Sequence, residues 1–589
     1  MHALAGIISP RGVPALAHPP QRMVDRLCHD SSRVPGYGTF EAIGARVGWV
    51  APPEAAAKPA WSRTRQVAVL LASDATALHS TQSAASLADA IEHSGLHALT
   101  SLNGWFSGLI VDLRDCTATL FNDRYGLGRL YYHETPHGFF FSSEAKSLLA
   151  VLPQLRQLDP RGVAELFSVG CVLQNRSLFS GIHLLPHGSA WKFHRDGRID
   201  KHRYFDPALW EQQPLLDSVT YGERLREVFA RIAARCVGGT SPVAMSLTGG
   251  LDSRAVMAWA GVEPGALPCY TFGGPFRDCA DVQIARRLAK LCQHPHTTIR
   301  IGSEFFSHFQ HLAEKSVYLS DGAMDVSGAV ELHVNRKARE IAPVRLTGNY
   351  GSEILRSHVA FRPGQLDRSL FTPDFNRLID EAAETYRQET ACHRLSFIAF
   401  KQVPWHHYAR FSVEKSQLTP RSPFLDNELV ALAYQAPREL SSSPRPLLHL
   451  IAQGNPSLAS LGTDRALRTR SFPLVSRAAR AWQEFTAKAE YAYDYGMPRW
   501  LARTDRALTG LRLEKLFLGR HKFYHFRVWY RDQLREIVHG HGQLTQPAFY
   551  REGVARQLTA DHVSGRANRT LELHKLLSLQ LIDRSLLRA

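Results

Sequence analysis

Short apolar runs bounded by turn residues dominate the first third of the chain. Runs at 66–71, 106–111 and 138–141 have the length and composition of β-strands. Few stretches in this region show the three-to-four-residue spacing of an amphipathic helix. Residues 1 to about 205 are therefore predicted to form a domain of strands and turns with a few helices.

From about residue 218 the pattern becomes an alternation of helices and strands. Helical periodicity covers 220–235, the residues after 253, and 280–292. Strand-like runs lie at 242–245, 269–272, 297–301 and 343–346. Such a β-α-β rhythm predicts a parallel, doubly wound sheet. After about residue 375 the pattern is almost entirely helical, and a polar stretch at 205–217 is predicted to be a linker.

One strand-to-helix connection carries residues suited to phosphate binding. It reads Ser246-Leu247-Thr248-Gly249-Gly250-Leu251-Asp252-Ser253 and is called the phosphate loop below. The glycines allow backbone N–H groups to approach phosphate oxygens, and the following helix directs its positive end at the anion. Asp252 would repel a bare phosphate, which indicates a bridging Mg²⁺. The plain structural alternative is a Gly-Gly turn before a helix.

Composition and charge narrow the choice of partners. The chain has 589 residues and a formal charge of +16, so two or three domains and anionic partners are expected. A nucleotide, an acidic substrate or a basic proteome would each explain the charge. The basic residues are mostly scattered arginines without a nucleic-acid-binding signature, so no nucleic-acid partner is expected.

Neither a membrane segment nor a cysteine framework is expected. No apolar run reaches the ~18 to 20 residues of a membrane span, and the first residues lack the features of a signal peptide. A cytoplasmic protein is the default expectation. The eight cysteines form no C-x-x-C pair, so neither a zinc site nor a disulfide framework is predicted.

Several motifs in the same order point to one family. The phosphate loop resembles the S-G-G-x-D-S pyrophosphate loop of the asparagine synthetase and ATP-pyrophosphatase superfamily, with Thr248 in place of the first serine. Residues 121–132 resemble the family's R-D-x-x-G-x-x-P-L-Y, and 141–148 resemble its A-S-E-x-K-A-L. Residues 421–426 resemble its R-x-P-F-L-D. The chain is thus identified as a member of the glutamine-hydrolysing, type B asparagine synthetase superfamily.

The resemblance implies an α/β protein of two domains. Residues 1–205 would be a glutaminase-like, class II amidotransferase-like domain with an N-terminal-nucleophile (Ntn) type α/β/β/α sandwich. Residues 218–475 would be a doubly wound, parallel-sheet ATP-pyrophosphatase domain, and 476–589 its helical C-terminal extension. The implied cofactors are ATP and Mg²⁺.

The resemblance also implies the ATP-binding residues. These are Leu247, Thr248, Gly249, Gly250, Asp252, Ser253, Phe272, Gly273, Thr347 and Gly348. The family's second metal motif, S-G-x-G-S/G-D-E, is altered here, because Ser352 stands where the acid is expected. Asp252 and the neighbouring Glu353 are therefore the metal candidates. A salt bridge at a helix start is the alternative role of Glu353.

The family's catalytic lysine has no evident counterpart. No lysine lies between Lys415 and Lys488, and Arg465, Arg468 and Arg470 occupy that region. These arginines, with Asp252, are the catalytic candidates, and an arginine would act through its charge alone. A solvated basic loop is the alternative.

The glutaminase residues are lost at three places. Gly6-Ile7 matches the G-I that follows the family's nucleophilic cysteine, which puts Ala5 at the cysteine position. The nearest cysteine, Cys28, falls in a predicted helix. Residues 29–33 replace the H-R-G-P-D loop, and 72–74 replace N-G-E. The resemblance therefore predicts an inactive glutaminase.

The predicted function is an ATP-dependent ligase that adenylates a carboxylate, releases pyrophosphate and forms an amide with an amine from a source other than its own hydrolysis of glutamine. The amine acceptor would belong to a small molecule, glycan or peptide. Ring closure within one substrate, as in lasso-peptide cyclases and β-lactam synthetase, is one alternative. An inactive nucleotide-binding scaffold and a tRNA-modifying pyrophosphatase are the others. A homodimer or partner enzymes of a biosynthetic pathway also stay open.

Overall fold

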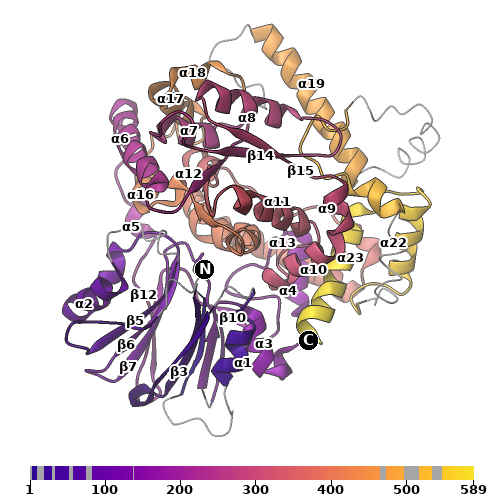
Figure 1. The fold of residues 1–589 in the computed structure, drawn as a ribbon. Helices are drawn as coiled ribbons and strands as arrows, with labels where there is room; N and C mark the ends of the chain where they lie inside the picture. The colour runs from indigo at the N-terminus through magenta and orange to yellow at the C-terminus, as the bar shows by residue number, and fades with distance from the viewer. Residues whose placement is uncertain are drawn as a thin grey trace.

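The computed structural model describes residues 3–9, 19–29, 34–51, 58–73, 83–136, 138–463, 473–496, 517–532 and 547–588. Figure 1 shows a β-rich half from the N-terminal part of the chain, below a larger half in which helices surround a second type of sheet. The last helices return to the side of the larger half. In the described ranges no helix has the length and apolar character of a membrane span.

The N-terminal half is built from two antiparallel sheets. One has the strand order β10-β8-β9-β1-β3-β2, and the other has the order β12-β11-β7-β6-β5-β4. The first sheet consists of β1 (Ala3–Ile8), β2 (Val34–Phe40), β3 (Ala45–Ala51), β8 (Tyr131–Thr135), β9 (Gly138–Ser142) and β10 (His183–Leu184). The second consists of β4 (Ala60–Trp61), β5 (Val67–Ser73), β6 (Phe106–Asp112), β7 (Thr117–Asn122), β11 (Ser189–Phe193) and β12 (Ile199–Arg203).

The two sheets pack face to face on an apolar core. Leu4, Leu109, Leu120, Phe141 and Trp191 are buried there, and they come from strands of both sheets. Helices α1 (Pro19–Asp25) and α3 (Ala145–Val151) cover the first sheet, and α2 (Ala84–Ser94) covers the second. The predicted α/β/β/α sandwich is confirmed.

The larger half contains the predicted parallel sheet, in the order β15-β14-β13-β16-β17. Its strands are β13 (Val243–Ser246), β14 (Cys269–Gly273), β15 (His296–Arg300), β16 (Val344–Thr347) and β17 (Thr419–Arg421). Helices α7 (Asp252–Trp259) and α8 (Ala280–Leu291) lie over one face, and α11 (Gly328–Ile341) lies on the other (Figure 1). The sheet is therefore doubly wound, and β17 is an edge strand that the pattern did not predict.

Helices dominate the rest of the chain, as predicted. Those before residue 251 are α4 (Pro160–Ser168), α5 (Ala208–Glu211) and α6 (Ser218–Val237). The middle of the chain adds α9 (Ser303–Ser307), α10 (Phe309–Leu319), α12 (Gly351–Arg356), α13 (Pro373–Glu389), α14 (Arg394–Phe397), the π-helix η6 (Ile398–His407), α15 (Tyr408–Lys415), α16 (Asn427–Tyr434), α17 (Arg445–Gly454) and α18 (Pro456–Ser460). The last are α19 (Pro473–Tyr491), α22 (Val554–Val563) and α23 (Thr570–Ile582).

Two local predictions need correction. The predicted linker at 205–217 contains the short helix α5. Cys28 lies after α1, which ends at Asp25, and not inside a helix. The domain limits at 205, 218, 475 and 476 stay predictions.

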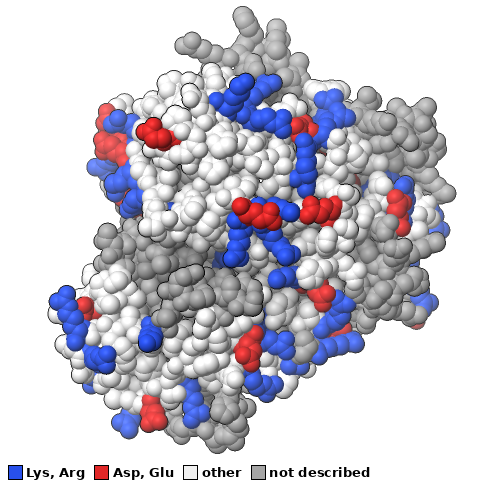
Figure 2. Space-filling model, in the orientation of Figure 1, with Lys and Arg blue, Asp and Glu red and all other residues white. Residues whose placement is uncertain are grey.

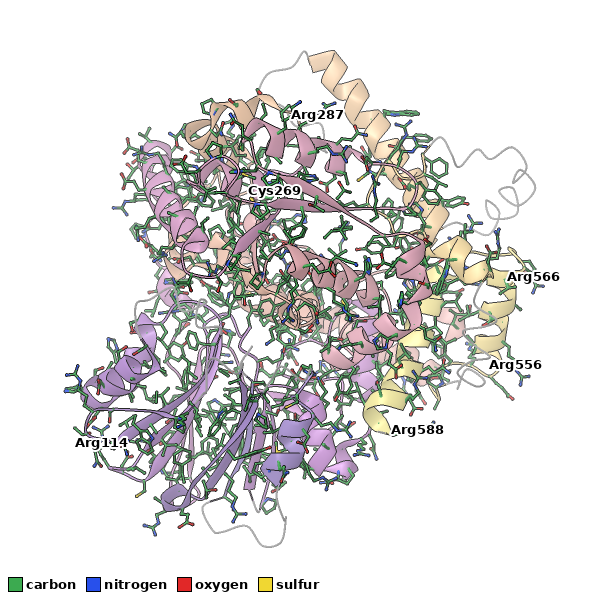
Figure 3. All side chains as sticks on the ribbon, in the orientation of Figure 1. Arg114, Cys269, Arg287, Arg556, Arg566 and Arg588 are labelled. Atoms are coloured by element: carbon green, nitrogen blue, oxygen red, sulfur yellow. The ribbon has the colours of Figure 1, made fainter. Side chains whose placement is uncertain are left out.

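The positive charge is spread over the visible surface. Figure 2 shows Lys and Arg side chains over both halves, with acidic side chains between them. Arg114, Arg556, Arg566 and Arg588 lie at the periphery in Figure 3, and Arg566 is within 3.3 Å of the Asp561 carboxylate. This scattered arrangement is the one expected from the sequence.

Candidate active site

The phosphate loop leaves the carboxyl end of β13 and leads into α7, the location typical of ligand sites in open α/β sheets. Hydroxyl groups organise its turn. The Thr248 N–H donates to Ser253 Oγ at 3.1 Å, and the Oγ atoms of the two residues lie 2.9 Å apart. The Gly250 N–H donates to Thr248 Oγ1 at 3.3 Å. Thr248 and Ser253, whose hydroxyl groups are predicted to bind phosphate, are thus hydrogen-bonded to each other.

The buried Arg254 side chain holds the phosphate loop by hydrogen bonds to backbone carbonyls. Its side chain is buried in α7 and donates to the Gly249 carbonyl at 3.1 Å. It also donates to the carbonyls of Leu461 at 2.5 Å and Gly462 at 3.1 Å. A buried guanidinium gains from such multiple acceptors, and here it ties the loop to the segment after α18.

Glycines let the segment after β16 approach the phosphate loop. A Cβ atom added to Gly348 would lie 2.3 Å from the Ser253 nitrogen, and one added to Gly351 would lie 2.7 Å from the Asp252 Cβ. Between them Tyr350 adopts a left-handed backbone conformation with φ of 73°. This close approach brings the altered metal motif onto the start of α7.

A cavity of about 240 Å³ lies between these two segments. The predicted residues Thr248, Asp252, Ser253, Thr347, Gly348 and Glu353 line it. Leu247, Gly249, Gly250, Phe272 and Gly273 do not line it. Leu247 is fully buried, and its carbonyl accepts a hydrogen bond from Thr271 Oγ1 at 2.6 Å.

Asp252 and Glu353 both line this cavity, and Ser352 is hydrogen-bonded to Asp252. Ser352 Oγ donates to Asp252 Oδ2 at 2.7 Å, so the neutral residue at the family's acid position supports Asp252. Burial, and to a smaller extent the Asp252 charge, raise the pKa of Glu353 to about 7. His407 Nε2 lies 3.6 Å from Glu353 Oε1, but burial lowers the pKa of His407 to about 3, so it brings no charge at neutral pH.

The residues present fit a Mg²⁺ ion that also binds phosphate. Two hard carboxylate oxygen donors share one cavity, and the raised pKa of Glu353 indicates a place where added positive charge is favourable. No group of three or more His, Cys, Asp or Glu side chains able to hold a metal occurs in the described part of the chain. Mg²⁺ commonly binds through one or two carboxylates with substrate phosphates completing its shell, and this donor set matches that mode.

Charged side chains that the sequence pattern did not indicate also line the cavity, namely Arg345, Arg410 and Glu414. Arg345 Nη1 lies 3.0 Å from Glu414 Oε1, and Arg410 Nε lies 3.2 Å from Glu331 Oε1. Burial raises the pKa of Glu414 above its usual value. An arginine within the apolar strand Val344–Thr347 is the signal that would have found Arg345, because a buried charge requires a partner.

A lysine from the C-terminal part of the chain contacts the residue that supports the phosphate loop. The Lys522 ammonium forms an ion pair with Asp281 Oδ2, and the other oxygen of Asp281 accepts the Gly249 N–H at 2.6 Å. Lys522 also lies 4.2 Å from the centre of the Phe272 ring, a cation–π contact. A lysine candidate for the loop therefore lies well beyond the 415–488 region. Arg465, Arg468 and Arg470 lie outside the described residues.

The glutaminase position holds no nucleophile. Ala5 is fully buried within β1, where it pairs with Gly48 of β3 and Ser142 of β9. In the neighbouring replaced loop, His29 Nε2 lies 2.8 Å from Glu144 Oε1. Glu144 in turn lies 2.6 Å from Lys146 Nζ, which is 3.1 Å from Asp321. In the described residues, the predicted glutaminase position is thus surrounded by apolar packing, and a buried charge network lies at His29.

The sandwich still contacts the phosphate-loop cavity. The ring of Trp105, between α2 and β6, lies 6.3 Å from the Tyr350 ring. The Asn103 amide donates to Asp426 Oδ2 at 2.7 Å, in the segment that resembles R-x-P-F-L-D. In that segment Ser422 Oγ donates to the Asn349 carbonyl at 2.6 Å. A chain of contacts therefore connects the N-terminal half to the segment that carries Glu353.

Two protein families match the chain, one in each half. A glutamine amidotransferase domain matches residues 64–205, and the asparagine synthase family matches residues 224–451. A protein named as putative asparagine synthetase (glutamine-hydrolyzing) 2 of Methanocaldococcus jannaschii is 25% identical over 297 residues, which cover 48% of this chain and 56% of that protein.

Two Bacillus subtilis proteins also match. Asparagine synthetase (glutamine-hydrolyzing) 3 is 27% identical over 175 residues, 29% of this chain and 28% of its own length. Asparagine synthetase (glutamine-hydrolyzing) 1 is 22% identical over 275 residues, 46% of this chain and 42% of its own length. The chain thus spans about half of the first relative and less than half of the other two.

Among solved structures, a B. subtilis glutamine phosphoribosylpyrophosphate amidotransferase with ADP and GMP is 13% identical and covers 50% of this chain and 65% of that chain. The TM-score of that match is 0.23. The sandwich, the parallel sheet with its phosphate loop, and the two matching families agree with one another. The chain belongs to the asparagine synthetase superfamily.

Proposed function

We propose that this protein is an ATP-dependent ligase that joins a carboxylate to an amine. A carboxylate oxygen attacks the α-phosphorus of ATP, the bond to the β-phosphate oxygen breaks, and pyrophosphate leaves. The amine then attacks the acyl carbonyl, AMP leaves, and the amine loses a proton as the amide forms. The family match and the phosphate loop support this chemistry.

The phosphate loop would hold the triphosphate. Thr248 and Ser253 offer hydroxyl donors, and α7 directs its N-terminus at the same place. Asp252 and Glu353 would hold Mg²⁺, which when bound neutralises charge on the departing pyrophosphate. Ser352 would keep the Asp252 carboxylate oriented through their 2.7 Å hydrogen bond.

Lys522 would supply positive charge at the rim of the loop. A fixed cation close to developing negative charge lowers a barrier by electrostatic stabilisation. Asp281 holds Lys522 in place and also accepts the Gly249 N–H, so the lysine and the loop share one support. Lys522 is therefore the first choice for this role, and Arg465, Arg468 and Arg470 are the second.

The amine would come from a source other than glutamine hydrolysed by this chain. Ala5 has no nucleophilic atom and lies inside a strand. A thiol or hydroxyl next to a base is what amide hydrolysis by this type of domain requires. The acceptor would be ammonia or the amine of a small molecule, glycan or peptide, and ring closure is the case in which acid and amine belong to one substrate.

The meeting of Asp252 and Glu353 in one cavity is the observation that carries the proposal. A nucleotide-binding scaffold would not need two half-buried carboxylates next to a phosphate loop. The test is a screen of carboxylic acids with ATP, Mg²⁺ and a mixture of amines and ammonia, followed by AMP and pyrophosphate release. Release by the wild-type protein and none by Asp252→Asn is expected. No release with any acid would overturn the ligase assignment.

A further inference from the structure

A second cavity, of about 460 Å³, lies between the two halves of the molecule. The sandwich side contributes Arg129, His187 and Arg203, and the π-helix η6 contributes Lys401 and Trp405. None of its lining residues lines the phosphate-loop cavity. The helix that begins as η6 and continues as α15 reaches both cavities, since His407 and Phe411 line the other one. The cavity is therefore a separate site at the domain interface.

The acidic side chain that lines this cavity, Glu389, already has partners for both of its carboxylate oxygens. Glu389 Oε2 lies 2.7 Å from Lys401 Nζ, and Glu389 Oε1 accepts the Gln174 side-chain amide at 2.9 Å. These contacts hold the pKa of Glu389 below its usual value, so the carboxylate stays ionised and paired. Arg176, also in the wall, forms an ion pair with the buried Glu165. Lys401 and Arg176 are thus both neutralised within the protein.

Two further arginines are not neutralised in this way. Arg129 donates to the Pro404 carbonyl and to the Tyr131 hydroxyl at 3.1 Å, and its guanidinium carbon lies 3.5 Å from the Tyr408 ring centre. All three partners are uncharged. Arg203 is exposed at the end of β12 and forms no ion pair with any residue in the described ranges. The wall therefore carries two positive charges that lack a carboxylate partner within the described part of the protein.

Polar and aromatic groups in the same wall are also available. The His187 Nδ1 atom is buried without a hydrogen-bond partner among the residues that the structure describes. Burial, and then the charge of Arg203, lower the pKa of His187 to about 3, so the ring is neutral at physiological pH. Trp405 lines the cavity and is partly buried against the apolar core of the larger half. A buried unpaired nitrogen is costly unless a ligand or water satisfies it.

We propose that this interdomain cavity binds a small molecule that carries a carboxylate or phosphate group on an uncharged ring. Arg203 and Arg129 would take the anionic group, because guanidinium groups match the geometry of carboxylate and phosphate oxygens. His187 would add a hydrogen bond, and the Trp405 ring would pack against the ligand ring. This site is independent of the proposed ligase reaction.

Isothermal titration calorimetry on the full chain tests the proposal with four probes. These are inorganic phosphate, glucose 6-phosphate, glucuronate and neutral glucose. We expect at least one of the two anionic sugars to bind and glucose not to bind. The comparison of glucose 6-phosphate with glucuronate distinguishes a phosphate from a carboxylate ligand, and inorganic phosphate alone is expected to bind more weakly because it cannot contact Trp405.

Two charge-reversal variants distinguish binding in this cavity from unspecific attraction of an anion to a basic protein. Arg203→Glu should weaken binding of the sugar anion at least tenfold. Arg224→Glu, on an exposed position of α6 outside the cavity, should change the dissociation constant less than twofold. Trp405→Ala should weaken the sugar anion and leave phosphate unchanged. Circular dichroism checks that each variant is folded.

Binding to neither anionic sugar, or equal weakening by Arg203→Glu and Arg224→Glu, would overturn the proposal. Asp252→Asn should leave this binding intact, because Asp252 lies in the other cavity. Loss of sugar binding in Asp252→Asn would instead place the ligand in the phosphate-loop cavity and also overturn it. Binding to the interdomain cavity is thus tested with Arg203→Glu, whereas the ligase assignment is tested with Asp252→Asn, so the two proposals can fail independently.

Discussion

The indole ring of Trp105 meets the Phe411 ring edge-on, with ring centres 4.9 Å apart. Trp105 belongs to the sandwich, whereas Phe411 lines the phosphate-loop cavity of the other half. Trp105 also contacts Tyr350, whose left-handed backbone lies in the segment before Glu353. The N-terminal half, for which no glutaminase activity is predicted, therefore contacts the wall of the proposed ATP site.

Replacing Trp105 should impair this support. Aromatic pairs contribute roughly 0.5–1.5 kcal/mol beyond simple burial, so we expect Trp105→Ala to lower the rate of ATP–pyrophosphate exchange about tenfold. Trp105→Phe should keep most of the rate. Trp482→Ala is the control, because Trp482 is 52% exposed on α19. An unchanged exchange rate in Trp105→Ala would show that the sandwich does not support the site.

Neutralising the cavity carboxylates should stop adenylation. Asp252→Asn and Glu353→Gln each remove a negative donor, and we expect each to lower exchange by about 100-fold or more, the size typical of lost electrostatic stabilisation. Raising the Mg²⁺ concentration should recover part of the loss in Glu353→Gln. Glu340→Gln, at an exposed position of α11, serves as the control. Full activity of Glu353→Gln would remove this residue from the metal site.

Lys522 and the three arginines can be ranked by substitution. We expect Lys522→Ala to lower the exchange rate about 100-fold and Lys522→Arg to retain part of it, since the guanidinium keeps the charge. Arg465→Ala, Arg468→Ala and Arg470→Ala should each have less than a tenfold effect. The reverse order, with one arginine essential and Lys522 dispensable, would return the role to the arginine segment.

Glutaminase activity should be absent and should not return with a cysteine. Ala5 is fully buried in the middle of β1, so a thiol placed there in Ala5→Cys would have no free α-amino group beside it and no access to solvent. Coupled measurement of glutamate release should give the buffer rate for the wild type and for Ala5→Cys. Glutamate release by purified wild-type protein would contradict this.

Acid should destabilise the fold through buried neutral histidines. Burial lowers the pKa of His187 and His407 to about 3 and that of His406 and His562 to about 4. An unfolded histidine titrates near 6.5, so these groups stabilise the fold fully above that pH. As pH falls from 6.5 towards 4, the unfolded chain binds protons that the folded chain does not. The free energy of unfolding then falls by about 1.4 kcal/mol per pH unit per histidine.

The midpoint of urea unfolding should consequently be lower at pH 5.5 than at pH 7.5. His187→Gln should reduce this difference, because one buried titrating group is removed. His202→Gln, at an exposed position on β12, should leave the difference unchanged. An equal midpoint at both pH values would show that these histidines do not control the acid stability.

Local patterns predicted the architecture well. The strand, Gly-Gly turn and helix around Thr248 are neighbours in sequence, and short-range propensity and hydrophobic periodicity decide such elements. The periodicity also located β14, α8 and β16 within a few residues. β17 was missed because it has only three residues and contains Pro420, which is unusual within a strand.

Relations between distant residues were not accessible in the same way. Lys522 forms an ion pair with Asp281, which in turn accepts the Gly249 N–H of the phosphate loop, and only the packing of the C-terminal segment brings these distant residues together. Trp105 and Phe411 belong to different halves, so no periodicity connects them. Glu353 was identified because it follows Ser352 in the altered motif. Its position in the same cavity as Asp252 depends on the turn at Tyr350, which the sequence pattern did not indicate.

The hydrogen bond from Ser352 to Asp252 has a consequence for the charge balance of the cavity. An acid at position 352 would place a second carboxylate against Asp252, and with Glu353 present three negative groups would crowd one small cavity. Serine at position 352 therefore leaves this cavity with one negative charge fewer than the S-G-x-G-S/G-D-E motif would supply, so an ion bound there would keep more of its own positive charge for the phosphates.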